Sequence, residues 1–199
     1  MQVKTDKYYS PAEYLELETA AEYRSEYING EIIPMSGGSA NHNQISLNLS
    51  SALNFALRGQ PYRVFINDMR LWILNYRLYT YPDIMVVGSP LEFVENRRDT
   101  ITNPIIIAEV LSNSTEKYDR GEKFKRYRTI PSFKEYLLIS QNAIQVEVFT
   151  KNDENKWLLS EYEGADSILR LNELQFQISL SEIYDKVELN LNDEKDYDS

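Results

Sequence analysis

The strongest pattern of apolar and polar positions is a run from Pro104 to Leu111 in which Glu109 is the only charged side chain. A short run that is rich in β-branched residues predicts a strand covered on both of its faces. A carboxylate in such a strand costs several kcal/mol unless another group compensates its charge. We therefore expect Glu109 to have a partner and to serve function rather than packing.

A second apolar strand is predicted at residues 81–87, where Asp83 directly follows Pro82. Acids are also common in turns and caps, so Asp83 alone does not distinguish chemistry from turn formation. If the two strands pair, Asp83 and Glu109 reach one point, and two adjacent carboxylates require a proton or a metal cation. Together with the backbone carbonyl of Val110, their oxygens form a suitable ligand set for a hard cation such as Mg²⁺.

A helix is predicted over residues 115–128, directly after the strand that contains Glu109. On this helix Asp119, Lys123 and Tyr127 recur every fourth residue and share one face. An ordinary salt bridge is a sufficient explanation for Asp119 and Lys123 taken by themselves. Beside two carboxylates, however, Lys123 can hold an attacking water or contact a phosphate. The combination predicts a metal-dependent phosphodiesterase.

The first part of the chain carries clear helix and turn signals. Ser10 and Pro11 are typical of a helix start, and this helix is expected to bury Tyr14, Leu15 and Leu17. An Asn-Gly pair at positions 29 and 30 predicts a hairpin between two extended runs.

A longer helix is expected to start near residue 41, with Ile45, Leu49 and Leu53 on its buried side. His42, the only histidine, lies at its start. A lone histidine at such a position is more often a cap or a partly buried residue than a catalytic one.

Further strands are predicted at residues 62–66, 70–74, 135–139, 143–150, 156–162 and 176–180, followed by a short helix near residues 181–187. The strand at 135–139 follows the 115–128 helix, and such a crossover implies some parallel pairing. The strands at 143–150 and 156–162 flank a turn and predict an antiparallel hairpin. We therefore expect an α/β (α+β) fold, in which helices flank a mixed sheet and additional antiparallel hairpins are attached.

Length and composition are those of one globular domain. The chain has 199 residues, 42% of them hydrophobic and 26% charged, and no internal repeat divides it. We expect a single domain over residues 1–190 and an acidic, mobile tail over residues 191–199. The absence of cysteine excludes disulfides and thiolate zinc sites, and no apolar segment is long enough to span a bilayer. A cytoplasmic protein that does not associate with membranes is the expectation.

The charge distribution leaves the question of nucleic-acid binding open. A net charge of −10 opposes binding to phosphates. However, the segment 120–128 contains five basic residues and one acidic residue, next to the predicted site. A solvated helix face and a nucleic-acid contact explain this segment equally well.

Four blocks in this order carry a resemblance to a known family: Tyr81-Pro82-Asp83-Ile84-Met85-Val86-Val87, Ile107-Ala108-Glu109-Val110-Leu111-Ser112, Asp119-Arg120-Gly121-Glu122-Lys123-Phe124 and Glu135-Tyr136-Leu137. In order and spacing they resemble the Uma-type restriction endonucleases, a group within the PD-(D/E)xK nuclease superfamily. The resemblance extends over nearly the whole chain. It implies a restriction-endonuclease-like core and an endonuclease that needs Mg²⁺ or Mn²⁺ and hydrolyses phosphodiester bonds of nucleic acid, with DNA as the expected partner.

The resemblance assigns Asp83 and Glu109 to the two acids of the family pattern. Leu111 stands where the (D/E)xK pattern has its lysine, so the resemblance implies Lys123 of the following helix as the replacement. Asp83, Glu109 and Lys123 are thus the expected catalytic residues.

Three supporting residues complete the expected site. Glu26 and His42 match family positions that face the site, and Asp119 is expected to orient the catalytic lysine. Since symmetric cutting of both strands of a duplex favours a two-fold arrangement, a homodimer is also expected.

Two other functions remain open at this stage, because a shared fold does not establish activity. The first is a catalytically weak or inactive nuclease-like module that binds a protein or a nucleic acid. The second is a hydrolase of another phosphodiester. The acidic composition of the chain is compatible with the weak or inactive binding module.

Overall fold

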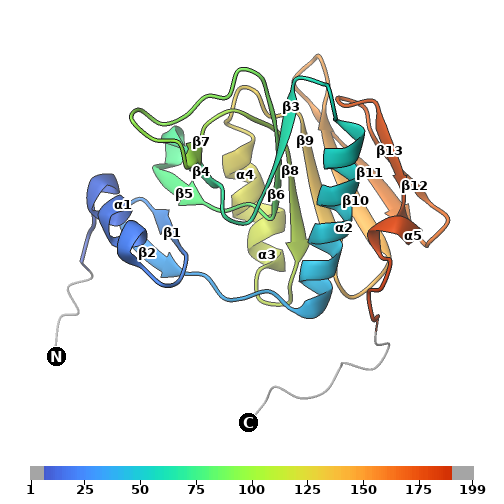
Figure 1. Cartoon of the computed structure of the whole chain (residues 1–199), viewed down its shortest axis with the longest axis horizontal. Coiled ribbons are helices and arrows are strands. Elements are labelled where there is room, and N and C mark those ends of the chain that lie inside the picture. The colour runs from blue at the N-terminus through green and yellow to red at the C-terminus, as the bar shows by residue number, and fades with distance from the viewer. Residues whose placement is uncertain (1–6, 190–199) are drawn as a thin grey trace, which may run out of the picture.

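The computed structural model describes residues 7–189 and contains three β-sheets (Figure 1). The largest sheet has six strands in the order β11-β10-β9-β8-β6-β3. The bounds of these strands are β3 (Tyr62–Ile66), β6 (Ile84–Gly88), β8 (Pro104–Leu111), β9 (Glu135–Ser140), β10 (Gln145–Lys151) and β11 (Trp157–Glu163). β8 and β9 pair in parallel and the other neighbours are antiparallel, so the expected mixed sheet is confirmed. The expected mobile tail at 191–199 lies outside the described residues.

A five-stranded sheet has the order β2-β1-β5-β4-β7, and a two-stranded sheet contains β12 and β13. Their bounds are β1 (Ser25–Ile28), β2 (Glu31–Pro34), β4 (Arg70–Ile73), β5 (Leu78–Thr80), β7 (Thr100–Ile101), β12 (Ile168–Leu171) and β13 (Phe176–Ser179). The turn between β1 and β2 has positive φ at Asn29 (44°) and Gly30 (107°), which is the conformation that an Asn-Gly hairpin turn requires. The expected β1–β2 hairpin is therefore confirmed.

Two longer helices and several short ones cover the sheets. Their bounds are α1 (Pro11–Ala20), α2 (Ala40–Ala56), η1 (Leu74–Tyr76), α3 (Glu116–Tyr118), η2 (Asp119–Lys123), α4 (Phe124–Tyr127) and α5 (Leu180–Ile183). α3, η2 and α4 follow one another without a break and make up the helix predicted at 115–128, with η2 as a π-helical turn. None of the helices found in residues 7–189 is both long and apolar enough to cross a lipid bilayer.

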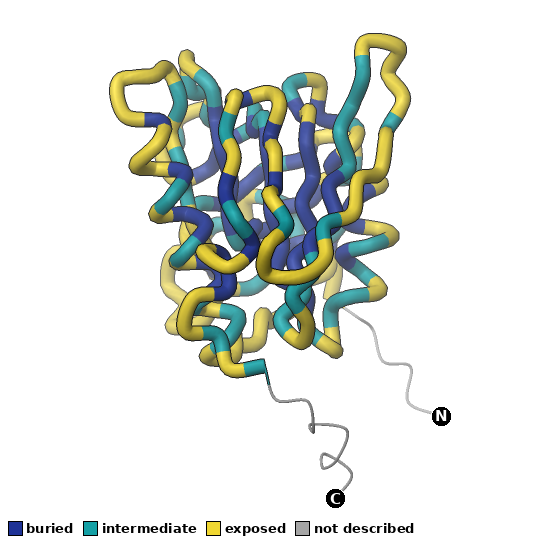
Figure 2. Tube along the Cα trace, turned by 90° about the vertical axis from the view of Figure 1, so that its right-hand side faces the viewer, coloured by how far each residue is buried: buried dark blue, intermediate teal, exposed yellow. Residues whose placement is uncertain are grey.

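The core lies on both faces of the six-stranded sheet. α2, α5, β12 and β13 pack on one face, and Ile45, Leu49 and Leu53 are buried there as the sequence predicts. α4 and part of the five-stranded sheet pack on the other face, where Tyr127 and Phe133 are completely buried. Figure 2 shows the buried stretches of the strands in the middle of the molecule and the exposed residues in the turns at their ends.

The buried side of α1 differs from the expectation. Tyr14 is fully buried, but Leu17 is 50% exposed and Glu18 is buried instead. Glu18 accepts hydrogen bonds from the hydroxyl of Tyr81 (2.8 Å) and from the backbone N–H of Ser25 (3.1 Å). These two bonds satisfy the carboxylate, so a polar residue occupies a core position that apolar periodicity alone does not predict.

A buried acid on β9 makes the stability of the fold dependent on pH. Glu135 at the start of β9 is fully buried, and burial raises its pKa to about 7. A pKa above that of the unfolded chain stabilises the fold below the unfolded value of 4.5, and this stabilisation is lost as the pH rises through 7.

We therefore expect Glu135→Gln to remove a fall of about 2 to 3 kcal/mol in the free energy of unfolding between pH 4.5 and 7. Urea unfolding of both proteins across this pH range measures the difference. Parallel pH curves for the two proteins would contradict the assignment.

Candidate active site

Asp83 and Glu109 lie at the same end and on the same face of the six-stranded sheet. β6 and β8 are antiparallel neighbours in which Ile84 lies opposite Ala108, so the next position places the two acids beside each other. Because side chains alternate between the faces, both carboxylates fall on the side that packs against α4. The backbone N–H of Asp83 lies 3.5 Å from Oε2 of Glu109.

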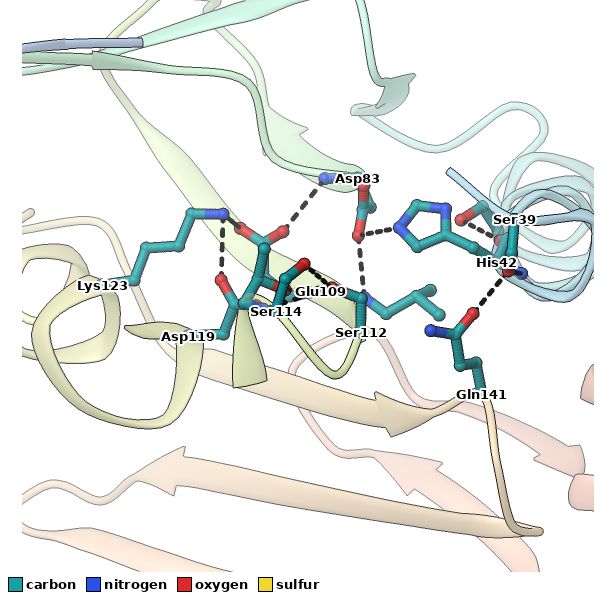
Figure 3. A network of polar contacts seen from close by, with 12 residues as sticks. Ser39, His42, Asp83, Glu109, Ser112, Ser114, Asp119, Lys123 and Gln141 are labelled. Carbon is teal, nitrogen blue, oxygen red and sulfur yellow. Dashed lines mark hydrogen bonds and ion pairs between the residues drawn. The ribbon is translucent and has the colours of Figure 1, made fainter. Parts of the chain in front are cut away.

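Two groups fix the carboxylate of Asp83, and both contact Oδ2 (Figure 3). The backbone N–H of Val110 donates a hydrogen bond at 2.8 Å, and Nε2 of His42 lies at 3.1 Å. His42 is in the first turn of α2, where Ser39 caps the helix by accepting a hydrogen bond from the backbone N–H of His42. The start of α2 and the start of β6 are thus joined through an imidazole and a carboxylate.

Glu109 has the partners that its position in an apolar strand demands. The hydroxyl of Tyr127 donates a hydrogen bond to Oε1 at 2.7 Å, and Nζ of Lys123 lies 3.0 Å from the same oxygen. The side chain of Glu109 is 3% exposed and that of Lys123 is 9% exposed. The charge of the carboxylate is therefore compensated inside the protein by a cation and a hydroxyl.

Lys123 reaches the acids from the π-helical turn η2. Its Nζ lies 3.2 Å from Oδ1 of Asp119, so the ammonium bridges two carboxylates from different elements (Figure 3). π-helical turns occur frequently at functional sites. Asp119, Lys123 and Tyr127 are all buried and face the sheet, in agreement with the spacing in the sequence.

Burial and charge shift the pKa values of this cluster in different directions. Burial raises the pKa of Glu109 to about 8, and the charge of Lys123 only partly opposes that rise. Burial by itself lowers the pKa of Lys123, but the charges of Glu109, Asp119 and Glu26 outweigh burial and raise this pKa well above its usual value. The lysine is consequently a permanent cation in the cluster.

The pKa of His42 is set by the same competition. Burial lowers it, but the hydrogen bond to Asp83 and the charge of Asp83 raise it by more, so the net shift is upward. The pair with Asp83 therefore favours the imidazolium.

Glu26 lies beside the cluster. It is buried in β1, lines the same cavity as Asp83, and accepts a hydrogen bond from the hydroxyl of Thr80. Its charge also helps to raise the pKa of Lys123. Glu26 thus shapes the electrostatic field at Lys123.

A cavity of about 860 Å³ opens over the acids. Its walls come from the β1–β2 hairpin at residues 25–34, called the β1–β2 arm below, and from the loop after it. The start of α2 and residues that follow β8 complete the walls. The side chain of Asp83 is 15% exposed, and those of Glu109 and Lys123 are less so. The reactive groups therefore lie at the bottom of this cavity.

The basic segment 120–128 contributes mainly to the fold. Arg120 pairs with Glu116 at 2.8 Å and with Glu147 at 2.5 Å, and Lys125 lies 3.5 Å from Glu122. Of the five basic residues in this segment, Lys123 is the one that lines the cavity.

The donors at this site suit a hard divalent cation. Mg²⁺ is commonly held by one or two carboxylates, with water and substrate phosphate supplying the other ligands. Asp83 and Glu109 are such a pair of acids, and both line the cavity. Within residues 7–189 no group of three or more His, Asp or Glu side chains is placed to hold a metal ion. The expected carbonyl ligand Val110 lines the cavity as well.

Sequence reasoning missed several residues of the site. The hydrogen bond between Tyr127 and Glu109 and that between Thr80 and Glu26 join positions far apart in the chain. Tyr118 and Arg24 also line the cavity. The position of Tyr127, four residues after Lys123 on a helical face, was the one signal for these contacts.

Comparisons with known proteins agree on the family and the fold. The family Uma2, described as "Putative restriction endonuclease", matches residues 11–182. A protein of Synechocystis sp., "Uncharacterized protein sll1609", is 46% identical over 167 residues, which cover 84% of this chain and 94% of that protein. Another from the same organism, "Uncharacterized protein slr1290", is 37% identical over 177 residues, which cover 88% of this chain and 90% of that protein.

A solved structure shares the fold. The chain is similar to the crystal structure of "a putative nuclease belonging to DUF820" from Anabaena variabilis, with a TM-score of 0.72 and 21% sequence identity. The similarity covers 88% of this chain and 97% of the other. The match over residues 11–182 and the two relatives show that the chain belongs to the Uma2 family, whose description indicates a nuclease-like role.

Proposed function

We propose that the protein is a divalent-metal-dependent endonuclease that hydrolyses phosphodiester bonds of nucleic acid, with DNA as its substrate. The observation that carries this proposal is the convergence of Asp83, Glu109 and Lys123, from β6, β8 and the following helix, at the bottom of one cavity. Two carboxylates that can hold a divalent cation and a nearby ammonium are suited to the charge stabilisation that phosphodiester hydrolysis needs. The family description supports the same reaction class.

Asp83 and Glu109 are the residues that would hold the cation, with the carbonyl of Val110 as a further ligand. When bound there, Mg²⁺ or Mn²⁺ supplies charge neutralisation on the phosphate and lowers the pKa of a water molecule. The protein's own contribution is to keep the two carboxylates fixed. The N–H of Val110 and His42 do this for Asp83, and Tyr127 and Lys123 do it for Glu109.

Lys123 is the group suited to contact the scissile phosphate or the attacking water. Its ammonium lies between the carboxylates of Glu109 and Asp119, and its side chain lines the cavity. Asp119 acts on the reaction through this contact, so Asp119 is a positioning residue. His42 and Glu26 support the site from two sides, through Asp83 and through the field at Lys123 respectively.

The inactive binding module remains the competing function, and it makes the opposite prediction for cleavage. A homodimer also remains a prediction, which rests on the two-fold symmetry of duplex DNA. Light scattering of the purified protein measures that state independently of activity.

We expect the wild-type protein to nick plasmid DNA and to cut a single-stranded oligonucleotide in the presence of Mg²⁺ or Mn²⁺, and EDTA to abolish both reactions. Asp83→Asn should lower the rate by at least about a hundredfold, because one of the two metal-binding carboxylates loses its charge. The amide oxygen still accepts the hydrogen bond from Val110, so the fold is retained. Gel analysis of nicked and linear plasmid measures the effect.

The matched control is Asp166→Asn, which makes the same change at an exposed position outside the cavity. It should cleave like the wild type. Equal cleavage by the Asp83→Asn and wild-type proteins would refute the proposed metal site. The absence of cleavage of both plasmid and single-stranded oligonucleotide, in all proteins and with both metals, would favour the inactive module.

Lys123→Met should lower cleavage by at least about a hundredfold and the free energy of unfolding by about 3 to 5 kcal/mol, since Glu109 and Asp119 then lose their buried cation. Lys123→Arg keeps the charge and should remain closer to the wild type in stability. It should still lose at least about tenfold in rate, because a planar guanidinium does not occupy the position of an ammonium.

Lys125→Met is the control for this pair, because Lys125 is exposed and contacts Glu122 outside the cavity. It should change neither rate nor stability appreciably. If Lys123→Arg cleaves DNA as fast as the wild type, Lys123 is a structural counter-ion and does not act in the reaction.

A further inference from the structure

The substrate must bring a phosphate to the bottom of the cavity, and the walls decide which substrates can do this. The side chains of Glu109 and Lys123 are almost inaccessible, and the cavity above them is bounded by the β1–β2 arm, the start of α2 and the segment after β8. A DNA duplex is stiff over a length of about 150 base pairs. Each of its phosphates can enter a cavity only together with the paired second strand. A single strand can instead bend one nucleotide into such a space.

One wall of the cavity is apolar and aromatic. Tyr23, Ile33 and Met35 line it, and they are 78%, 42% and 37% exposed. The backbone N–H of Met35 donates a hydrogen bond to the carbonyl of Arg24, which holds the segment before β1 against the end of β2. Exposed aromatic side chains along a binding cavity are the surfaces on which unpaired bases stack.

Polar side chains that carry no charge also line the cavity. Ser39, Asn43, Ser112, Ser114 and Gln141 line it. Hydroxyl and amide groups can donate hydrogen bonds to phosphate and sugar oxygens without adding positive charge. The lining of the cavity thus includes apolar groups suited to a base and polar groups suited to the sugar-phosphate of a nucleotide.

The charges around the cavity oppose a duplex. Six acidic side chains line it, together with the cations Arg24 and Lys123 and the imidazole of His42. All three already have acidic partners: Asp68 lies 3.5 Å from Arg24, Glu109 lies 3.0 Å from Lys123, and Asp83 lies 3.1 Å from His42. Duplex DNA carries a negative charge about every 1.7 Å, and proteins bind it by neutralising several phosphates with Lys and Arg. The basic residues Arg120 and Lys125 beside the site are paired with acids as well.

We propose that the cavity takes an unpaired nucleotide of a single-stranded DNA segment, whose base packs against Tyr23, Ile33 and Met35. This inference rests on the proposed function, because it names the substrate class of the same site. Strand selection then comes from shape and stacking, and the acids at the bottom of the cavity remain available to the metal.

The test is the binding of a fluorescently labelled oligonucleotide, measured by anisotropy in Ca²⁺ so that the strand stays intact. The same sequence is offered as a single strand and as a duplex with its complement. We expect the single strand to bind at least about tenfold more tightly. Tyr23→Ala should weaken single-strand binding about tenfold, because one stacking surface is lost, and should leave duplex binding unchanged.

The matched control is Phe55→Ala, which removes an aromatic ring that is 67% exposed on α2 and lies outside the cavity. It should bind both oligonucleotides like the wild type. Duplex binding that equals or exceeds single-strand binding would overturn the inference, as would no binding of either, or equal losses in the two variants. Binding in Ca²⁺ is measured without cleavage, so this result is independent of the cleavage test. A nuclease that prefers duplex DNA would cleave plasmid but would not bind the single strand more tightly.

Discussion

The cost of burying the charge of Glu109 governs the local structure around it. A carboxylate on an apolar strand requires nearby compensation, and here Lys123 and Tyr127 provide it from one face of one helix. The same requirement brings Asp119 into the protein, because the buried ammonium bridges two acids. Burying these charged groups costs free energy. It also leaves fixed, poorly hydrated charges, which are suited to bind a cation and to stabilise charge on a phosphate.

The arm that walls the cavity depends on a second buried polar network. Tyr81 donates a hydrogen bond to Glu18 and accepts one from Nε of Arg70, so α1 is joined to the five-stranded sheet. The rings of Tyr14 and Tyr27, with centroids 5.2 Å apart, pack in the same region. Since Tyr81 lies two residues before Asp83, this network fixes the arm close to the acids that it covers.

Charge is used differently in this chain than its basic segment suggests. The cations at residues 120–128 largely pair with acidic residues, and the ionisable groups of the cavity are acidic apart from Lys123, Arg24 and His42. Under the proposed function, binding of nucleic acid at this surface would depend on a metal cation at the centre and on stacking and hydrogen bonding around it. These ion pairs favour the structural interpretation of the basic segment over the interpretation as a nucleic-acid contact.

The sequence by itself determined the elements and the main members of the site. Short continuous apolar runs predicted β6 and β8, spacing by four placed Asp119, Lys123 and Tyr127 on one face, and the resemblance to a nuclease family linked these blocks. Only the tertiary structure decided that His42 contacts Asp83, that Glu18 and not Leu17 is buried in α1, and that Tyr23, Ile33 and Met35 line the cavity. The physical reason is that periodicity reports the local geometry of one element. Contacts between distant residues depend on strand register and on how the elements pack, which no local pattern encodes.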